Sequence, residues 1–571
     1  MSRMKSLKLP ILAVLVLAAL FGVAWLALGG RFGLSLLFVR HVLREESAPH
    51  RAVVWQPGPA TAPEAPPDHA DAAPDPARRR PPNIVLIVVD DLGHADLSAH
   101  GAGIADGRVR TPNIDGIARR GVNFATGYAA NATCAPSRAA IMTGRYPTRS
   151  GYEFTPTAPR LMKIVASAKV DAHPAPFALY FDEREREQPP FEQMALPLGE
   201  ITLGQLLQGA GYHTVHIGKW HLGERGAFAA HLRGFDESLS LQYGASMYLP
   251  EDDPRVVNDN VGLNPLDAFI WAGGPWGVSY NGGQPFKPDR YLTDYFTAEA
   301  VKVIDANRHR PFFLYLAYNA PHTPLQAARE DYAALSSIKD HRLRIYAAMI
   351  RSLDRGIGEV LAALRERGLE DDTLVIFTSD NGAPHYISLG LRNAPFRGWK
   401  ATYFEGGIRV PFFMRWPAGL PEGRTVAGPA VHFDLFATVA AAAGAALPAD
   451  RVIDGVNLLP HARGETTAPP HSQIFWRTDR YLTLREGDWK LQSTQMPRLD
   501  RLYNLAADPL ERHNLAESQP ERLRSMRLLL ERFDESQAKP LWPSLGAMYV
   551  PIDRTSKERG TTGEDYIYFS N

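Results

Sequence analysis

Cysteine is nearly absent from this chain, since Cys134 is the only one in 571 residues. A single cysteine excludes an internal disulfide, so its value lies in packing, in reactivity or in conversion to another group. Pro136 restricts Ala135 to an extended conformation, and Ser137 and Arg138 begin a predicted helix. Cys134 is therefore expected in a loop just before a helix N-terminus, where backbone donors and Arg138 would meet an anion.

An excess of charge of either sign is also lacking. Lys+Arg and Asp+Glu each total 62, so the formal net charge is zero. This balance excludes the global basic character that indicates a nucleic-acid partner, and any recognition of anions must be local. With 45% hydrophobic residues, the chain can form a large core and is expected to contain more than one domain.

The N-terminus carries an unbroken apolar run from residue 11 to residue 30, preceded by Arg3, Lys5 and Lys8. The run is long enough to cross a bilayer of about 30 Å as a helix. It exceeds the usual apolar core of a secretory signal and has only a weak cleavage site, which favours an uncleaved anchor with a cytoplasmic amino end. We assign residues 1–48 to this membrane anchor or signal segment.

A Pro- and Ala-rich stretch, residues 49–82, follows the anchor. Its composition cannot bury a core and predicts a semi-rigid linker. The catalytic domain is expected over 83–469 and a C-terminal subdomain with its tail over 470–571. This order places the folded part outside the cytoplasm, membrane-anchored and periplasmic in a bacterium, or secreted if the segment is cleaved.

Polar side chains follow several apolar runs that predict buried strands of a parallel sheet. The run 83–89 ends in Asp90 and Asp91, and the run 373–379 ends in Asp380 and Asn381. Open α/β sheets bind ligands at the carboxyl ends of their strands, and adjacent carboxylates repel unless a cation neutralises them. A helix N-cap explains one of the paired aspartates but not both.

Basic side chains follow two further predicted strands. After the strand 212–217, Lys219 and His221 are two positions apart, so in an extended segment both would point to the same side, toward one oxyanion. His322 lies on a loop after the strand 311–318. Beyond residue 470, short strands at 474–477, 481–485 and 489–492 and a helix at 520–533 predict a small antiparallel sheet with a helix packed on it.

Several of these segments together resemble the type I, formylglycine-dependent sulfatases of arylsulfatase type. The resemblance rests on Cys134-Ala135-Pro136-Ser137-Arg138 with Thr143-Gly144-Arg145, on the hexapeptide 218–223, and on the block 397–411 with Lys400. It runs from about residue 83 to residue 515 with all blocks in the family's order. It implies an alkaline-phosphatase-like α/β fold, with a large mixed, mostly parallel sheet flanked by helices and a smaller C-terminal antiparallel sheet and helix.

The resemblance also implies a mechanism. A maturation enzyme would oxidise Cys134 to formylglycine. One hydroxyl of its hydrate would attack the sulfur of a sulfate ester and displace the alcohol, and the second hydroxyl would then collapse to the aldehyde and expel sulfate. The implied catalytic residues are Cys134, Arg138, Lys219, His221, His322 and Lys400, with His221 as the base and with His322 and Lys400 as the proton source. The metal ligands would be Asp90, Asp91, Asp380, Asn381 and an oxygen of residue 134. These hard oxygen donors favour Ca²⁺, with Mg²⁺ second, over Zn²⁺.

Three other functions are compatible with parts of this pattern. A phosphonate or phosphate ester hydrolase of the same superfamily would use a similar cradle, and a membrane-anchored glycan-binding protein would have lost the activity. A phosphatase-like transferase would use a hydroxyl nucleophile, for which Ser137 is the nearest candidate. The segments 152–198 and 239–290 carry no motif that distinguishes a sulfated sugar from an aryl sulfate, and the tail 539–571 carries no readable motif.

Overall fold

The computed structural model describes residues 35–40, 47–61, 80–101, 103–168, 176–260 and 265–571. The apolar run 11–30 and most of the expected linker, 62–79, lie outside these residues. Within the described part of the chain, no helix combines the length and the apolar character that a membrane crossing requires. The N-terminal anchor therefore stays a prediction.

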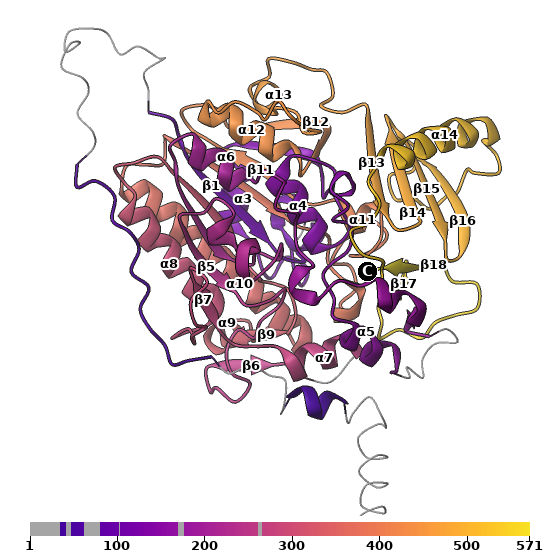
Figure 1. Ribbon diagram of the computed structural model, residues 1–571, viewed down its shortest axis with the longest axis horizontal. Helices are drawn as coiled ribbons and strands as arrows, with labels where there is room; N and C mark the ends of the chain where they lie inside the picture. The colour runs from indigo at the N-terminus through magenta and orange to yellow at the C-terminus, as the bar shows by residue number, and fades with distance from the viewer. Residues whose placement is uncertain (1–34, 41–46, 62–79, 102, 169–175, 261–264) are drawn as a thin grey trace, which may run out of the picture.

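A nine-stranded sheet forms the centre of the described chain, in the order β12-β2-β11-β10-β1-β8-β4-β5-β7 (Figure 1). Its strands are β1 (Asn83–Val89), β2 (Val122–Tyr128), β4 (His213–Gly218), β5 (Glu237–Leu241), β7 (Val278–Tyr280), β8 (Phe312–Ala317), β10 (Thr373–Ser379), β11 (Phe412–Arg415) and β12 (Arg424–Val431). The central run β10-β1-β8-β4-β5 is parallel, while β11 and β7 are antiparallel to their neighbours. The mixed, mostly parallel sheet that the family resemblance implies is confirmed.

Helices cover both faces of this sheet because its central strands alternate between two apolar cores. In β1, Val85, Ile87 and Val89 belong to one core, and Ile84, Leu86 and Val88 belong to the other. The first core is covered by α3 (Pro112–Arg119), α8 (Leu292–Ala306) and α10 (His341–Glu366), and the second by α4 (Cys134–Thr143), α6 (Leu203–Gly209) and α12 (Asp434–Ala443). A strand buried on both faces is expected to be apolar along its length, as β1 is from Ile84 to Val89.

Shorter elements complete the catalytic part. They are α5 (Pro159–Ala166), α7 (Pro265–Gly273), α9 (Arg329–Ala334), α11 (Glu405–Ile408), α13 (Leu459–Arg463), and the pair β6 (Val256–Asn258) and β9 (Gln326–Ala328). The long helix α10 begins where Asp340 accepts a hydrogen bond from the backbone N–H of Leu343, a standard N-cap.

The C-terminal part contains a four-stranded antiparallel sheet, which lies beside the catalytic sheet in Figure 1. Its strands are β13 (Gln473–Thr478), β14 (Tyr481–Glu486), β15 (Trp489–Gln495) and β16 (Arg498–Asn504), and α14 (Pro520–Ser536) packs on it. The apolar contact is formed by Leu484, Leu491 and Leu502 with Met526 and Leu530. The predicted sheet and helix are confirmed, and β16 extends the sheet beyond the three expected strands.

The tail that carried no readable motif is folded. Strands β17 (Gly546–Pro551) and β18 (Tyr566–Ser570) pair with each other, and β17 also pairs with β3 (Ala178–Tyr180). Residues 152–198 are longer and more polar than the family core needs, so the sequence predicts a surface insertion there. This insertion contributes β3 to a sheet built with the end of the chain. The charge run 183–187 of the insertion, which the sequence predicts to be solvated, lies in a 3-10 helix, Asp182–Glu187, with no buried residue.

The beginning of the expected linker contacts the catalytic domain. Val53 and Trp55 are buried in the core that α8 covers, and Trp55 Nε1 donates a 2.8 Å hydrogen bond to Glu299 Oε2 of α8. The backbone N–H of Gly58 donates to the carbonyl of Ala306 at 2.7 Å. The expectation that no residue before Asn83 belongs to the folded part is therefore wrong, because Val53 and Trp55 provide apolar area that the proline-rich composition hides.

Candidate active site

The four parallel neighbours β10, β1, β8 and β4 place their carboxyl ends at one edge of the sheet. Asp380 and Asn381 follow β10, Asp90 and Asp91 follow β1, and Lys219 follows β4. Asp91 has a left-handed backbone, with φ of 63°, which turns the chain sharply where β1 ends. This edge is where open α/β sheets bind their ligands.

Cys134 approaches the same edge from helix α4, of which it is the first residue. The expectation that Cys134 lies in the loop before the helix is therefore wrong, because the helix begins three residues before the expected start at Ser137. The turn before it is held by Asn131, whose Oδ1 accepts from the N–H and the hydroxyl of Thr133 at 3.1 and 3.0 Å. Ser137 Oγ donates to the Asn131 carbonyl at 2.7 Å and accepts from its N–H at 3.1 Å. The Ser137 hydroxyl therefore has a structural role in this turn.

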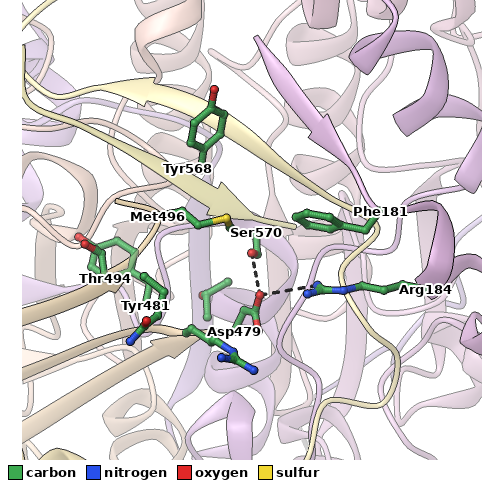
Figure 2. A pocket seen from close by; sticks show the side chains of 11 residues that line it. Phe181, Arg184, Asp479, Tyr481, Thr494, Met496, Tyr568 and Ser570 are labelled. Carbon is green, nitrogen blue, oxygen red and sulfur yellow. Dashed lines mark hydrogen bonds and ion pairs between the residues drawn. The ribbon is translucent and has the colours of Figure 1, made fainter. Parts of the chain in front are cut away.

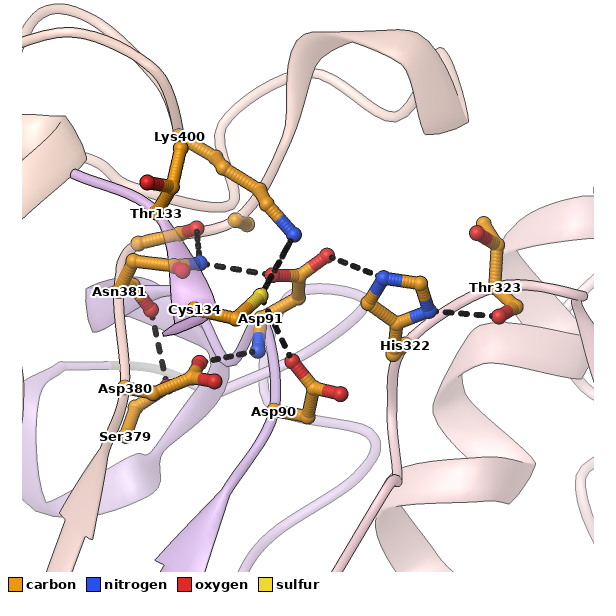
Figure 3. A network of polar contacts seen from close by, with 12 residues as sticks. Asp90, Asp91, Thr133, Cys134, His322, Thr323, Ser379, Asp380, Asn381 and Lys400 are labelled. Carbon is orange, nitrogen blue, oxygen red and sulfur yellow. Dashed lines mark hydrogen bonds and ion pairs between the residues drawn. The ribbon is translucent and has the colours of Figure 1, made fainter. Parts of the chain in front are cut away.

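The Cys134 sulfur lies among charged groups, as Figure 3 shows. Sγ is 3.4 Å from Asp90 Oδ1, 3.9 Å from Asp91 Oδ1 and 3.1 Å from Lys400 Nζ. Burial, followed by the negative charge of Asp380, raises the pKa of the Cys134 thiol far above its ordinary value. An unmodified Cys134 is thus a protonated thiol and a poor nucleophile, because the thiolate is the reactive form.

Each of the paired aspartates binds a lysine. Lys219 Nζ is 2.7 Å from Asp90 Oδ2, and Lys400 Nζ is 2.7 Å from Asp91 Oδ1. Burial alone would raise the pKa of both carboxyls, but Lys219 and Lys400 more than offset it and hold these pKa values below the ordinary range. Burial would likewise lower the pKa of both lysines, yet the nearby anions raise it. The site therefore holds two carboxylates and two ammonium groups.

Arg138 is fully buried and forms an ion pair with Asp380, which follows β10. Its Nε and Nη2 lie 3.0 and 2.9 Å from Asp380 Oδ2, and its Nη1 donates to the Lys219 carbonyl at 3.0 Å. The other oxygen of Asp380 accepts from the N–H of Asp91 at 3.3 Å. Arg138 therefore ties α4 to the ends of three strands, a use that suits the fixed fork of a guanidinium.

His322 also reaches the aspartates. Its Nε2 lies 3.6 Å from Asp91 Oδ2, and its Nδ1 lies 2.6 Å from the carbonyl of Thr323. Burial lowers the pKa of His322 although Asp90 and Asp91 act to raise it. The ring is therefore neutral near pH 7 and is held by its own loop.

The backbone conformation that positions His221 differs from the one that the sequence predicted. The chain is not extended there, because Gly218 and His221 have φ of 109° and 60°. The expectation that Lys219 and His221 point together from an extended segment is therefore wrong. The N–H of His221 donates to Glu224 Oε1 at 2.9 Å, and its Nδ1 has no hydrogen-bond partner among the described residues. Burial, and then the charges of Lys219 and Arg138, lower its pKa well below the ordinary value.

The ligand atoms of Asp90, Asp91, Cys134 and His322 all lie within 4.8 Å of one another, so this buried group can hold a metal ion. Asn381 contributes an oxygen that suits the same purpose. Its Nδ2 donates to Asp91 Oδ1 at 2.7 Å, while its Oδ1 is buried and has no partner in the described chain. A buried acceptor without a donor is costly, and a cation would satisfy it. The donor set fits a hard divalent cation once residue 134 offers oxygen in place of sulfur.

A comparison with protein families now identifies the chain. The family model described as Sulfatase matches residues 82–445, which is more than half of its length. The chain belongs to the sulfatase family. Its members are sulfuric ester hydrolases, and the phosphonate or phosphate ester alternative is not favoured.

Individual relatives and solved structures agree with this assignment. A steryl-sulfatase of Mus musculus is 36% identical over 479 residues, covering 72% of this chain and 70% of the relative. An N-acetylgalactosamine-6-sulfatase of the same organism is 34% identical over 425 residues, covering 72% of each chain. The crystal structure of Ps i-CgsB in complex with k-i-k-neocarrahexaose is 32% identical, with a TM-score of 0.67 over 81% of this chain and 95% of that chain. The alkaline-phosphatase-like fold is thereby confirmed.

The structure of this sulfatase adds polar residues that no sequence motif indicated. Tyr386 Oη donates to Asp91 Oδ2 at 3.3 Å, and Tyr315 Oη lies 3.4 Å from Arg138 Nη1. Glu224 holds the backbone of His221. In the sequence, a tyrosine in an apolar strand or in a loop is usually interpreted as a packing residue. The sequence indicated a role in the site only by position, since Tyr386 follows Asp380 and Asn381, and Glu224 follows the hexapeptide 218–223, by a few residues.

Proposed function

We propose that this sulfatase cleaves a sulfate monoester, of a sulfated sugar or of an aryl alcohol, with Cys134 matured to formylglycine and with a bound divalent cation. The observation that carries the proposal is the position of Cys134 Sγ, between Asp90 and Lys400 and with its pKa raised. As a thiol the residue is unreactive, whereas an aldehyde hydrate at the same place would present a hydroxyl nucleophile to the sulfur.

The proposed cation is Ca²⁺, with Mg²⁺ as the second choice. Asp90, Asp91, Asp380, Asn381 and an oxygen of residue 134 would hold it, and the free Asn381 Oδ1 supports this assignment. When bound, it would stabilise negative charge on the sulfate oxygens and on the nucleophile. His322 adds a nitrogen donor at this edge, but carboxylate and amide oxygens dominate the set, which favours hard cations over Zn²⁺.

The basic side chains would have different roles in the reaction. Lys219 and Lys400 are ammonium groups beside the aspartates and would neutralise the sulfate, while Arg138 holds Asp380 in place. Lys400 is charged and close to residue 134, so it can give a proton to the leaving alcohol oxygen, with His322 as its partner. A neutral His221 can accept the proton that the hydrate must lose when sulfate leaves.

The rival nucleophile fits this geometry less well. Ser137 Oγ is engaged with both backbone groups of Asn131, so a role as nucleophile would break the turn that positions residue 134. The glycan-binding alternative requires a damaged site, yet every expected side chain is present. We also propose that a maturation enzyme converts Cys134 and that residues 1–48 anchor the enzyme with its catalytic domain outside the cytoplasm.

The deciding experiment compares wild type with Cys134→Ala and Ser137→Ala, each produced together with a formylglycine-generating enzyme. Mass spectrometry of the peptide around residue 134 should show the thiol replaced by an aldehyde. Wild type should hydrolyse an aryl sulfate faster than the matching phosphate or phosphonate ester, and Cys134→Ala should be inactive. Ser137→Ala loses the contacts of the turn but not the nucleophile, so it should keep part of the activity per aldehyde-bearing chain. An unmodified cysteine in active protein, or full activity of Cys134→Ala, would overturn the proposal.

A further inference from the structure

A cavity of about 320 Å³ lies outside the residues described above, where three distant parts of the chain meet (Figure 2). The turn between β13 and β14 contributes residues 478–481, the segment after β3 contributes Phe181 and Arg184, and β18 contributes Tyr568 and Ser570. We call it the hairpin pocket. Its volume is in the range of pockets that hold small ligands.

Backbone pairing holds the walls of the hairpin pocket together. Strand β17 pairs with β3 on one side and with β18 on the other. The N–H of Phe181 donates to the Leu545 carbonyl at 2.8 Å, and the N–H of Tyr568 donates to the Met496 carbonyl at 2.9 Å. The insertion and the tail, for which the sequence offered no function, therefore form one wall, and the C-terminal sheet forms the other.

The charges of the pocket favour an anion. Asp479 is its only acid among the described lining residues, and Asp479 Oδ2 accepts from Ser570 Oγ at 2.9 Å and lies 3.8 Å from Arg184 Nη1. These contacts offset its charge. Arg480 is exposed at the tip of the turn and makes no hydrogen bond or ion pair with another described residue, which leaves one positive charge unpaired at the pocket. A guanidinium without an ion-pair partner can bind a carboxylate or a sulfate through paired hydrogen bonds.

Aromatic rings line the same cavity. Phe181 and Tyr568 are both partly buried, and Figure 2 shows the two rings on the wall formed by the insertion and the tail. The hydroxyl of Tyr568 donates to the Pro176 carbonyl at 2.9 Å, and the Arg184 guanidinium lies 4.3 Å from the centre of the Phe181 ring. Both rings are thereby held in position. Fixed aromatic rings beside an arginine match a sugar ring that carries an acidic group.

The hairpin pocket is also connected to the catalytic loop. Thr478 Oγ1, which lines the pocket, accepts from Asn131 Nδ2 at 3.2 Å. Asn131 Oδ1 in turn accepts from the N–H of Thr133, the residue before Cys134. The pocket and the reacting residue are thus joined through one asparagine side chain.

We propose that the hairpin pocket binds an anionic sugar unit, bearing a carboxylate or a sulfate, of a longer sulfated glycan whose ester is cleaved at residue 134. This inference rests on the proposed function, since it names the substrate class of the same enzyme. Arg480 supplies the charge, and Phe181 and Tyr568 supply the surface for the ring. It makes Arg480 a specificity residue that a small aryl sulfate does not use.

The first test measures binding by calorimetry with Cys134→Ala chains, which cannot turn over. The probes are hexasaccharides of chondroitin sulfate and of heparin, with neutral maltohexaose for comparison. At least one acidic probe should bind, and Arg480→Gln should weaken it by about 3- to 10-fold, Arg480→Glu by more, and added salt should weaken it further. Arg524→Gln is the matched control, because Arg524 is an exposed arginine on α14 that does not line the pocket.

The second test uses mature enzyme with an intact Cys134. For any acidic hexasaccharide that is hydrolysed, Arg480→Gln should raise KM, while kcat/KM for an aryl sulfate and the thermal midpoint stay at the wild-type values. Equal losses on both substrates would show a structural role and overturn the proposal. So would unchanged binding by Arg480→Glu, or the absence of binding by both acidic probes. An inactive wild type that still binds through Arg480 would instead count against the proposed function alone.

Discussion

Lys400 Nζ lies 3.1 Å from Cys134 Sγ and 2.7 Å from Asp91 Oδ1. One ammonium group thus contacts both the residue that the family oxidises and a carboxylate from the end of β1. The contact joins two segments 266 residues apart. The contact supports the proposed role of Lys400 as a proton source for an ester oxygen next to residue 134.

Replacing Lys400 by Met should therefore lower kcat for an aryl sulfate by about 100-fold or more, since a positioned acid contributes on that scale. Lys557→Met is the control, because Lys557 is exposed and outside the site. Formylglycine content must be matched by mass spectrometry before the rates are compared. A Lys400→Met enzyme within a few-fold of wild type would contradict the role given to this ammonium.

Removing the cation should destabilise the protein as well as inactivate it. A ligand at about 100 times its Kd adds about 2.7 kcal/mol to the free energy of unfolding, so Ca²⁺ should raise the thermal midpoint of chelator-treated enzyme by a few degrees. Asp91→Asn should abolish this rise, whereas Asp252→Asn, at an exposed position, should keep it. A rise with Zn²⁺ but not with Ca²⁺ or Mg²⁺ would refute the assignment.

Replacing Arg138 by Lys should lower stability although the charge is kept. Lysine cannot reproduce the paired contacts of Nε and Nη2 with Asp380 or the bond to the Lys219 carbonyl. Weakening a buried ion pair in this way should cost about 2–4 kcal/mol in the free energy of unfolding. Denaturant unfolding of Arg138→Lys and of the exposed control Arg524→Lys measures the difference, and equal transition midpoints would disprove it.

Glu224 should make stability depend on pH. Burial raises its pKa from 4.5 to about 8, so the folded chain holds this proton more tightly than the unfolded chain does. The stabilisation is complete below about pH 4.5 and is lost as the pH rises through about 8. The Glu224→Gln side chain stays neutral at every pH and does not lose this stabilisation. Its thermal midpoint should therefore rise relative to that of wild type as the pH increases.

The control for this titration is Glu192→Gln, which changes an exposed glutamate. Its midpoint should follow that of wild type at each pH. Parallel curves for Glu224→Gln and wild type would show that Glu224 ionises normally. Because Glu224 accepts from the N–H of His221, activity measured in the same series reports whether its ionisation disturbs that histidine.

Much of the architecture could be predicted because its signals are local. The runs 83–89 and 373–379 are mostly apolar, with Asn83, Thr373, Thr378 and Ser379 as polar exceptions near their ends, and they form β1 and β10 with the expected bounds. Burial on both faces favours apolar residues in the interior of a strand, so composition reveals such strands. The acids after them had to lie at one edge, because parallel strands end together.

Other parts depended on contacts between segments far apart in the sequence. Strand β18 pairs with β17, and β17 with β3 more than 360 residues earlier, so neither the folded tail nor the hairpin pocket has a local signature. His221 was placed by an assumption of extended backbone, whereas Gly218 and His221 both have positive φ. Turn geometry of this kind is set by what packs around it.

The sequence by itself determined the family and which side chains the proposed chemistry would use, because each proposed role needs a particular residue type within a family motif. The tertiary structure decided how they pair: Lys219 with Asp90, Lys400 with Asp91 and Cys134, and Arg138 with Asp380. Only the tertiary structure placed the insertion beside the tail. The physical reason is that hydrogen bonds and charge pairs depend on distances in space, which residue order alone does not specify.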